Sequence, residues 1–366
     1  MRMGRRRFLK TTGLTLAGLS LPMTLTSCNE ETPYMISKPN APQGSISVGI
    51  TRKDDIENAV RSAIDLAGGL DDIKSGDTVV IKPNITGPEI LLPARIYTHP
   101  KVLQGVIRAV KDRTNARNIT VAEASAFMLP TKTWAWEVGI LKVCNDEGVN
   151  FMAWETEDYL TVFSDDFEHI DFNFRVPLSL FDGSFDHFIN VPLLKNHDMI
   201  PGTNVDYTCC IKNHVGVVHP LDRVGGGEDT LGEALSHPTL NMGIHKVTLG
   251  DISAELNLAV PKHTMNVVDA LSIVLTGGPA ALAMDSAKPG LILASKDRVA
   301  CDSLAVAVLK HYAKEQNIDK PYVNKSVWDQ AQILRAQQLN LGRTKDKIDV
   351  IDEDVDNISD ILSQWI

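Results

Sequence analysis

Polar residues that could do chemistry stand directly after several apolar, strand-like runs of the chain. In open α/β sheets the carboxyl ends of parallel strands share one edge, and ligands bind in the crevice outside that edge. Side chains at these positions are therefore expected to meet in one site. The residues concerned are Lys82, Asn84, Glu123, Lys195 and His197.

The segment 206–237 is the densest in polar and glycine residues, and it adds Lys212, Asn213, His214, His219, Arg223 and His237. Lysine and arginine side chains favour a carboxylate or phosphate ligand. Lys82, Asn84, Lys195, Lys212, Asn213 and Arg223 are thus the predicted ligand-binding residues. A mobile glycine loop with exposed histidines is the alternative interpretation of this segment.

Proton transfer is assigned to Glu123, His197 and His214, because carboxylates and imidazoles serve as general acids and bases. The histidines His197, His214, His219 and His237 are also candidate ligands for a metal ion. Gly225-Gly226-Gly227 lacks the lysine of a phosphate-binding loop and the spacing of a dinucleotide-binding loop, so no nucleotide cofactor is expected.

The elements that must position these residues alternate along the chain. Apolar runs at 46–50, 77–81, 118–122, 149–154, 185–194, 265–275 and 289–294 predict strands, and helical periodicity predicts helices over 54–67, 99–110, 131–144 and 299–310. This alternation predicts an α/β fold, a mostly parallel sheet with helices on both faces. The aromatic-rich stretch 159–181 predicts an irregular, partly antiparallel insertion.

Composition limits the function classes. The net charge of −10 argues against a nucleic-acid partner, since such proteins need a basic face. No Cys-x-x-Cys motif is present, so an iron–sulfur cluster is unsupported. The adjacent Cys209 and Cys210 are two buried thiols, a vicinal disulfide or metal ligands. Asp269 and Asp302 lie in apolar surroundings and predict a helix cap or a structural salt bridge.

The first residues predict export. A basic stretch, Arg5-Arg6-Arg7-Phe8-Leu9-Lys10, precedes a short apolar run and then Leu25-Thr26-Ser27-Cys28. The first pattern resembles a twin-arginine signal and the second a bacterial lipobox. We therefore expect a signal peptide at 1–27, a lipid-anchored tether at 28–44 and one domain at 45–366. The twin-arginine translocase is the expected partner, and lipidated Cys28 would anchor the protein on the periplasmic side or the cell surface. An ordinary secretory signal with a chance cysteine is the alternative.

Several segments together resemble the family named domain of unknown function 362, over about residues 46–305. The supporting segments are VIKPN at 80–84, NVPLLKNH at 190–197, CIKNHVG at 210–216, GGP at 277–279 and ASKDRVACD at 294–302. Family members often have Lys-Thr-His where this chain has Lys195-Asn196-His197, and some carry a ferredoxin-type cluster motif that this chain lacks. The resemblance supports the location of the site and leaves the reaction open.

Three functions fit these observations. The first is an enzyme, or degenerate enzyme, that acts on a small anionic molecule at the carboxyl edge of the sheet. The second is a solute-binding lipoprotein that uses the same pocket without catalysis. The third is a structural surface protein without a ligand.

Overall fold

The computed structural model describes residues 32–366 except 88–91, 126–129, 199–201, 226–246 and 279–280. The body that contains the predicted site spans Pro33–Ile366. The predicted signal peptide, the lipidation residue Cys28 and His237 lie outside the described residues. None of the helices in the described part of the chain is long and apolar enough to cross a membrane.

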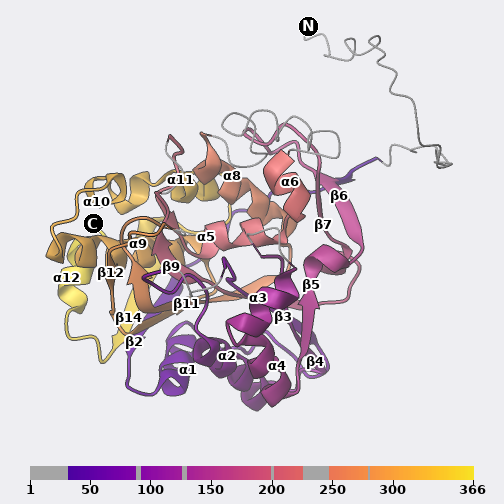
Figure 1. The fold of residues 1–366 in the computed structure, drawn as a ribbon, viewed down its shortest axis with the longest axis horizontal. Helices are drawn as coiled ribbons and strands as arrows, with labels where there is room; N and C mark the ends of the chain where they lie inside the picture. The colour runs from indigo at the N-terminus through magenta and orange to yellow at the C-terminus, as the bar shows by residue number, and fades with distance from the viewer. Residues whose placement is uncertain (1–31, 88–91, 126–129, 199–201, 226–246, 279–280) are drawn as a thin grey trace, which may run out of the picture. The chain divides into compact units, whose positions relative to one another are not determined.

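A large mixed sheet forms the centre of this body (Figure 1). All neighbours on its main path are parallel except around one strand, β13, which runs against both of its neighbours. The order of the main path is β14 (Ile348–Glu353), β2 (Ile46–Arg52), β13 (Leu291–Ser295), β11 (His263–Val274), β8 (His187–Val191), β3 (Thr78–Pro83), β4 (Asn118–Glu123) and β5 (Asn150–Ala153). Off the path, β9 (Leu193–Asn196) pairs with β10 (Tyr207–Thr208) and with β11, and β12 (Ser286–Ala287) also pairs with β11.

Helices cover both faces of the sheet, as the alternation of elements predicts (Figure 1). One face carries α1 (Ile56–Leu66), α2 (Pro100–Arg113), α3 (Thr131–Glu137) and α4 (Ile140–Glu147). The other carries α5 (Cys210–Asn213), α8 (Leu249–Glu255), α9 (Arg298–Glu315) and α11 (Ala331–Gln338). Shorter helices are α6 (Pro220–Gly225), α10 (Pro321–Asn324), α12 (Ile358–Ser363) and the 3₁₀ turns η1 (Trp154–Thr156), η2 (Leu178–Leu180), η3 (His214–Val217), η4 (Leu256–Ala259), η5 (Val327–Asp329) and η6 (Lys345–Lys347).

The predicted insertion is also present. Strands β6 (Tyr159–Phe163) and β7 (Phe174–Pro177) are antiparallel, and β1 (Tyr34–Met35) pairs with β6 to complete a separate three-stranded sheet.

Local sequence explains where several elements begin and end. Asp55 begins α1, because its carboxylate accepts hydrogen bonds from the amides of Glu57 and Asn58. Its apolar face, with Val60 and Ile64 fully buried, packs in the same core as the β3 residue Ile81. The periodicity of the sequence therefore predicts which face of α1 packs against the sheet.

Two predicted elements are each divided in the structure. The predicted helix 131–144 is two helices, because Gly139 adopts a left-handed conformation with φ of 80° between α3 and α4. The predicted strand 185–194 is two strands, β8 and β9, separated by Pro192. Proline has no amide hydrogen to donate to a strand ladder, so pairing is interrupted there.

Candidate active site

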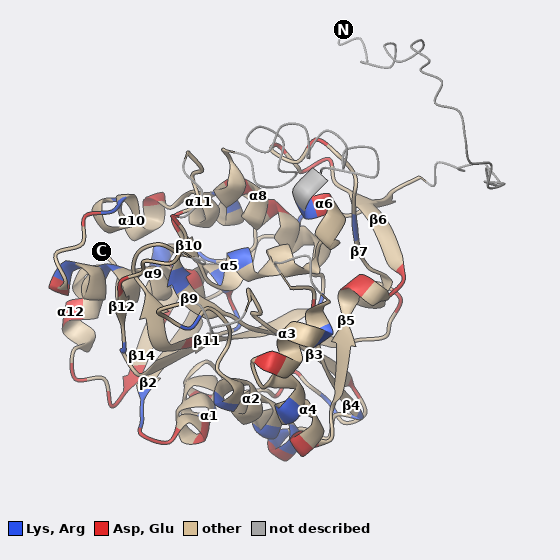
Figure 2. Ribbon diagram, viewed as in Figure 1, with Lys and Arg blue, Asp and Glu red and all other residues tan. Residues whose placement is uncertain are grey.

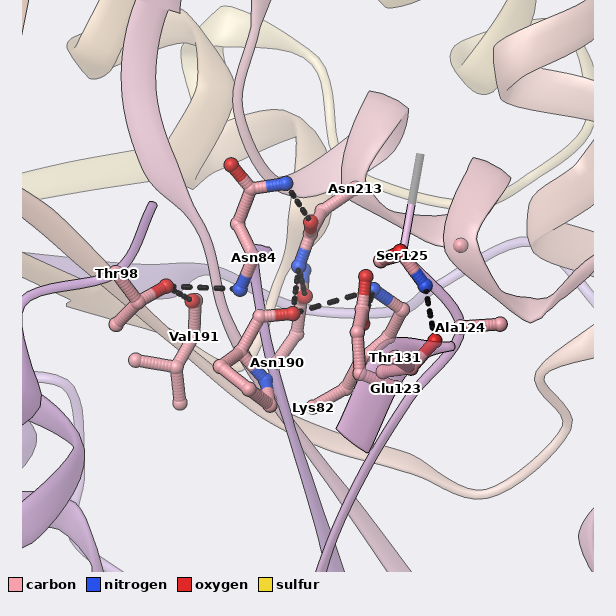
Figure 3. Close-up of polar contacts among 12 residues, drawn as sticks. Lys82, Asn84, Thr98, Glu123, Ala124, Ser125, Thr131, Asn190, Val191 and Asn213 are labelled. Carbon is pink, nitrogen blue, oxygen red and sulfur yellow. Dashed lines mark hydrogen bonds and ion pairs between the residues drawn. The ribbon is translucent and has the colours of Figure 1, made fainter. Parts of the chain in front are cut away.

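The site lies at the point in the sheet where the order of the strands reverses. After β3 the chain adds β4 and β5 on one side, and it then returns to place β8 on the other side of β3. Ligands of open α/β sheets bind at such a switch point, outside the carboxyl ends of the strands. The carboxyl ends of β3 and β8 meet at this point. Thr98 joins them, because its hydroxyl accepts a hydrogen bond from the backbone N–H of Asn84 at 2.8 Å and donates one to the Val191 carbonyl at 2.6 Å (Figure 3).

A buried ion pair is the first feature of the site. The Lys82 ammonium contacts the Glu123 carboxylate, and both side chains are almost completely buried (Figure 3). Burial raises the pKa of Glu123 to about 7, although the positive charge of Lys82 acts in the opposite direction. Burial also lowers the pKa of Lys82, against the pull of Glu123. The pair therefore holds a carboxyl group that titrates near neutral pH.

The 3₁₀ turn η3 closes over this ion pair. A Cβ atom placed on Gly216 would lie 2.5 Å from the Lys82 Nζ and 2.8 Å from the Glu123 Oε1. Only glycine lets the backbone approach the two charged groups this closely.

Lys195 is the second buried lysine, and its ammonium is fully hydrogen-bonded. It donates to the Asn84 Oδ1 at 2.9 Å, to the Thr86 hydroxyl at 2.6 Å and to the Ile96 carbonyl at 2.9 Å. Burial, and then the positive charge of Lys212, hold its pKa well below the usual value for lysine. The three acceptors satisfy all three N–H groups of a protonated amine, which offsets part of the cost of burying its charge.

Asparagine side chains connect Lys195 to the interior of the sheet. The Asn84 side-chain Nδ2 donates to the Asn213 Oδ1 at 3.1 Å. In the same way the Asn213 Nδ2 donates to the Asn190 Oδ1 at 2.8 Å, and the Asn190 Nδ2 donates to the Asn266 Oδ1 at 3.0 Å. Figure 3 shows the first two of these bonds at the end of β3. Each amide thus has a fixed orientation, since rotation of one would break two bonds.

The ion pair and the asparagine chain share one acceptor. The Pro83 carbonyl receives hydrogen bonds from the Lys82 Nζ at 3.2 Å and from the Asn213 Nδ2 at 3.4 Å. Five of the sequence-predicted site residues therefore lie in one connected cluster: Lys82, Asn84, Glu123, Lys195 and Asn213.

Lys212 is the third buried lysine, and it differs from the other two. Its side chain is 7% exposed, and within the described residues it has neither a hydrogen bond nor an ion pair. Burial, and then the charge of Arg223, lower its pKa to about 8. Basic residues on α5 and β9 are visible at the centre of the molecule in Figure 2. Lys212 is thus a cation without a described counter-ion.

Arg223 is predicted to bind a ligand, and the structure places its guanidinium among backbone carbonyls. It donates to the carbonyl oxygens of Ala124 at 2.8 Å, Ser125 at 2.9 Å, Val218 at 2.8 Å and Gly216 at 3.3 Å. These bonds tie the end of β4 to η3. Its charge contributes to the site, whereas its hydrogen bonds hold the backbone.

The candidate histidines do not form a metal centre in the described part of the chain. His197 is buried in the β9–β10 hairpin, where its amide donates to the Asp206 carbonyl at 3.0 Å. The His214 ring packs against Phe188 with ring centroids 5.5 Å apart, and His219 lies edge-on to Tyr159 at 4.5 Å. No described group of three metal-ligating side chains includes a histidine.

Some residues of the site were not predicted from the sequence. Thr86, Thr98, Asn190 and Asn266 all belong to the hydrogen-bond network. A signal existed for Asn190, because a lone amide within the apolar run 185–194 needs a buried partner. Of the two acids that the sequence places in apolar surroundings, Asp269 forms a salt bridge with Arg95 at 2.5 Å beside the site.

Comparison with known proteins adds the family. No curated protein and no solved structure matches this chain. A family model described as a domain of unknown function, DUF362, matches residues 79–307, which is more than half of the chain and contains every described residue of the site. The chain therefore belongs to the DUF362 family.

Proposed function

We propose that this protein is an enzyme that binds a small anion at the switch point and transfers a proton through Glu123. The observation that carries the proposal is the excess of positive charge. Among the described residues, the three buried lysines Lys82, Lys195 and Lys212 have one ion-pair partner between them, Glu123 on Lys82, because the nearby Asp269 is paired with Arg95. Buried charges without a partner are costly, so an anionic ligand at Lys212 would stabilise the folded protein.

The acid–base part rests on Glu123 and Lys212. The pKa of Glu123 is raised to about 7 and that of Lys212 is lowered to about 8, so both groups can exchange protons near neutral pH. Strongly perturbed groups in a cluster at the expected ligand edge favour catalysis over a structural role. Asn84 and Asn213 would orient the bound molecule, since their amides are held by their neighbours.

A thermal unfolding series tests anion binding. We would compare the full chain in chloride with the same chain in sulfate, phosphate or oxalate at equal ionic strength. A ligand at about 100 times its Kd stabilises the folded state by about 2.7 kcal/mol, which raises Tm by several degrees. Lys212→Met should abolish the increase. The matched control is Lys142→Met, because Lys142 is exposed on α4 and should leave the increase unchanged. Equal responses of both variants would contradict the proposal.

Turnover separates the enzyme from the solute-binding alternative. Wild type and Glu123→Gln would be assayed on a panel of small carboxylate and phosphate compounds. The proposal expects Glu123→Gln to bind anions and to lose turnover by at least about a hundredfold, the usual size of a general acid–base contribution. Binding without turnover by the wild type would favour the solute-binding protein.

The site of action belongs to the same proposal. We propose that the protein works outside the cytoplasm, exported by the twin-arginine translocase and anchored through lipidated Cys28. The support is the pattern around Arg5, Arg6 and Cys28.

A further inference from the structure

A second polar cluster lies between α5 and α9, next to the lysine site: the Asn190 side chain donates to the Cys210 carbonyl at 3.0 Å. Cys209 and Cys210 stand at the start of α5, and Cys301 and Asp302 lie in the first two turns of α9. All four side chains are completely buried. The proposed function uses none of them.

The spacing of the donor atoms is that of a metal site. The two sulfur atoms of Cys209 and Cys210 are 3.8 Å apart, and these sulfurs and a carboxylate oxygen of Asp302 all lie within 4.8 Å of one another. Zinc–sulfur bonds of about 2.3 Å in a tetrahedron place two sulfurs about 3.8 Å apart. The cluster can therefore close around one ion with little movement.

The Asp302 carboxylate is held in place for such a role. Its Oδ2 accepts from the Tyr207 hydroxyl at 3.0 Å and from the Ile211 amide at 3.3 Å, and its Oδ1 accepts from the Cys210 amide at 2.6 Å. Gln332 adds a bond to Oδ2 at 3.4 Å. The Oδ1 atom keeps one lone pair, and surrounding hydrogen bonds of this kind orient metal ligands.

The charge of a loaded site would be balanced nearby. Two thiolates, one carboxylate and one divalent cation leave a single negative charge. Arg298 is buried and has no carboxylate partner among the described residues; it donates to the Val260 carbonyl at 3.0 Å, and its Nε has no described acceptor. Burial lowers the pKa of Arg298 to about 10, against the negative charge of its neighbour Asp297 and then of Cys210, which places the guanidinium within electrostatic reach of the cluster. A buried guanidinium beside the cluster favours an anionic complex over two neutral thiols.

We infer that Cys209, Cys210 and Asp302 bind one Zn²⁺ ion, with Cys301 beside them. On binding, each of the two thiols releases its proton to solvent and forms a zinc–sulfur bond, so no oxidation is involved. Because the cluster is closed to solvent, the ion enters as the chain folds. Metal binding then contributes directly to folding stability.

Metal analysis of the full chain tests the inference. The protein would be purified under reducing conditions in metal-free buffer, and its metals counted by mass spectrometry. We expect about one zinc per chain in the wild type and less than about a tenth of that in Cys209→Ala/Cys210→Ala. Cys144→Ala is the matched control and should keep its zinc, because Cys144 is equally buried but belongs to the core on the opposite face of the sheet.

A second measurement needs no variant. Wild-type protein would be unfolded with a chelator and refolded with Co²⁺, which should give a sulfur-to-cobalt charge-transfer band and the strong visible absorption of a tetrahedral site. Three results would overturn the inference: folded, reduced wild type with less than about a tenth of a zinc both as purified and after refolding with Zn²⁺; copper in place of zinc; or a Cys209–Cys210 disulfide in the native protein.

Discussion

Burial determines the protonation of Glu123 more strongly than its partner Lys82 does. Its pKa is raised from 4.5 to about 7, so the folded state binds its proton more tightly than the unfolded state. The resulting stabilisation is fully present below about pH 4.5 and is lost as pH rises through about 7. The double variant Lys82→Met/Glu123→Gln removes both partners and leaves no unpaired charge.

We therefore predict that, between pH 5 and pH 8, the wild type loses more unfolding free energy than the double variant does. The difference should be on the order of 3 kcal/mol, from a pKa change of about 2.5 units. Urea unfolding at the two pH values measures it. Parallel pH profiles for the two proteins would show that Glu123 titrates in the folded state as it does in the unfolded chain.

Lys212 gives the anion site its own pH dependence. Its pKa is lowered to about 8, and only the ammonium form attracts an anion. We expect the affinity for sulfate, which does not titrate in this range, to fall roughly tenfold between pH 7 and pH 9. Titration calorimetry at each pH is the measurement. Lys212→Arg should bind sulfate with little change over the same range, since arginine stays charged; a fall as steep as that of the wild type would assign the effect to another group.

At the scale of elements, β9 is positioned by a close approach of the loop after β11. A Cβ atom on Gly278 would lie 1.9 Å from the Asn196 carbonyl oxygen, which is backbone and cannot turn away. Asn196 follows Lys195 at the end of β9, so the glycine contact helps to place the lysine. Gly278 also donates its amide to the Asn196 Oδ1 at 3.3 Å.

Gly278→Ala is thus predicted to displace β9, to cost more than about 2 kcal/mol of unfolding free energy and to remove the sulfate response. Gly76→Ala is the control. Gly76 has a φ of 90° and no neighbouring atom near its added Cβ, so the change costs about 1–2 kcal/mol of backbone strain while the sulfate response remains. The two variants would be compared by urea unfolding with and without sulfate. If Gly278→Ala kept the full sulfate response, the contact between Gly278 and Asn196 would not be needed for anion binding.

At the scale of the whole molecule, the predicted signal and lipid anchor concern where the protein works. Replacing Arg5 and Arg6 by lysine keeps the charge and should block recognition by the twin-arginine translocase. Precursor is then expected to accumulate in the cytoplasm, as seen by cell fractionation. Normal export of the double-lysine variant would point to the ordinary secretory route.

Cys28→Ala tests the anchor separately from export. Stable attachment needs more than one acyl chain, which lipidation of the cysteine would provide. The variant should be exported and recovered in the soluble fraction, whereas the wild type stays with the membrane. Membrane association of Cys28→Ala at the wild-type level would contradict the lipobox interpretation.

Apolar periodicity was enough to predict the alternating elements and the helices on both faces of the sheet. It reports which side of each element is buried, and burial of one side per element leaves few ways to stack the layers. The sequence also pointed to one edge of the sheet, because Lys82, Glu123 and Lys195 each follow an apolar run. The residue types at Gly139 and Pro192 are consistent with the two divisions, because glycine readily adopts a left-handed conformation and proline lacks the amide hydrogen that strand pairing needs.

Tertiary structure alone decided which partner each polar side chain meets. Asn190 and Asn266 face each other only because β8 and β11 pair in a particular register. Arg223 donates to the carbonyls of Ala124 and Ser125, just after β4. The candidate histidines meet different partners, since the His214 ring packs against Phe188 and the His219 ring against Tyr159. Local patterns determine how far a side chain is buried, whereas strand register and crossover connections determine its partners, and these depend on residues distant in the sequence.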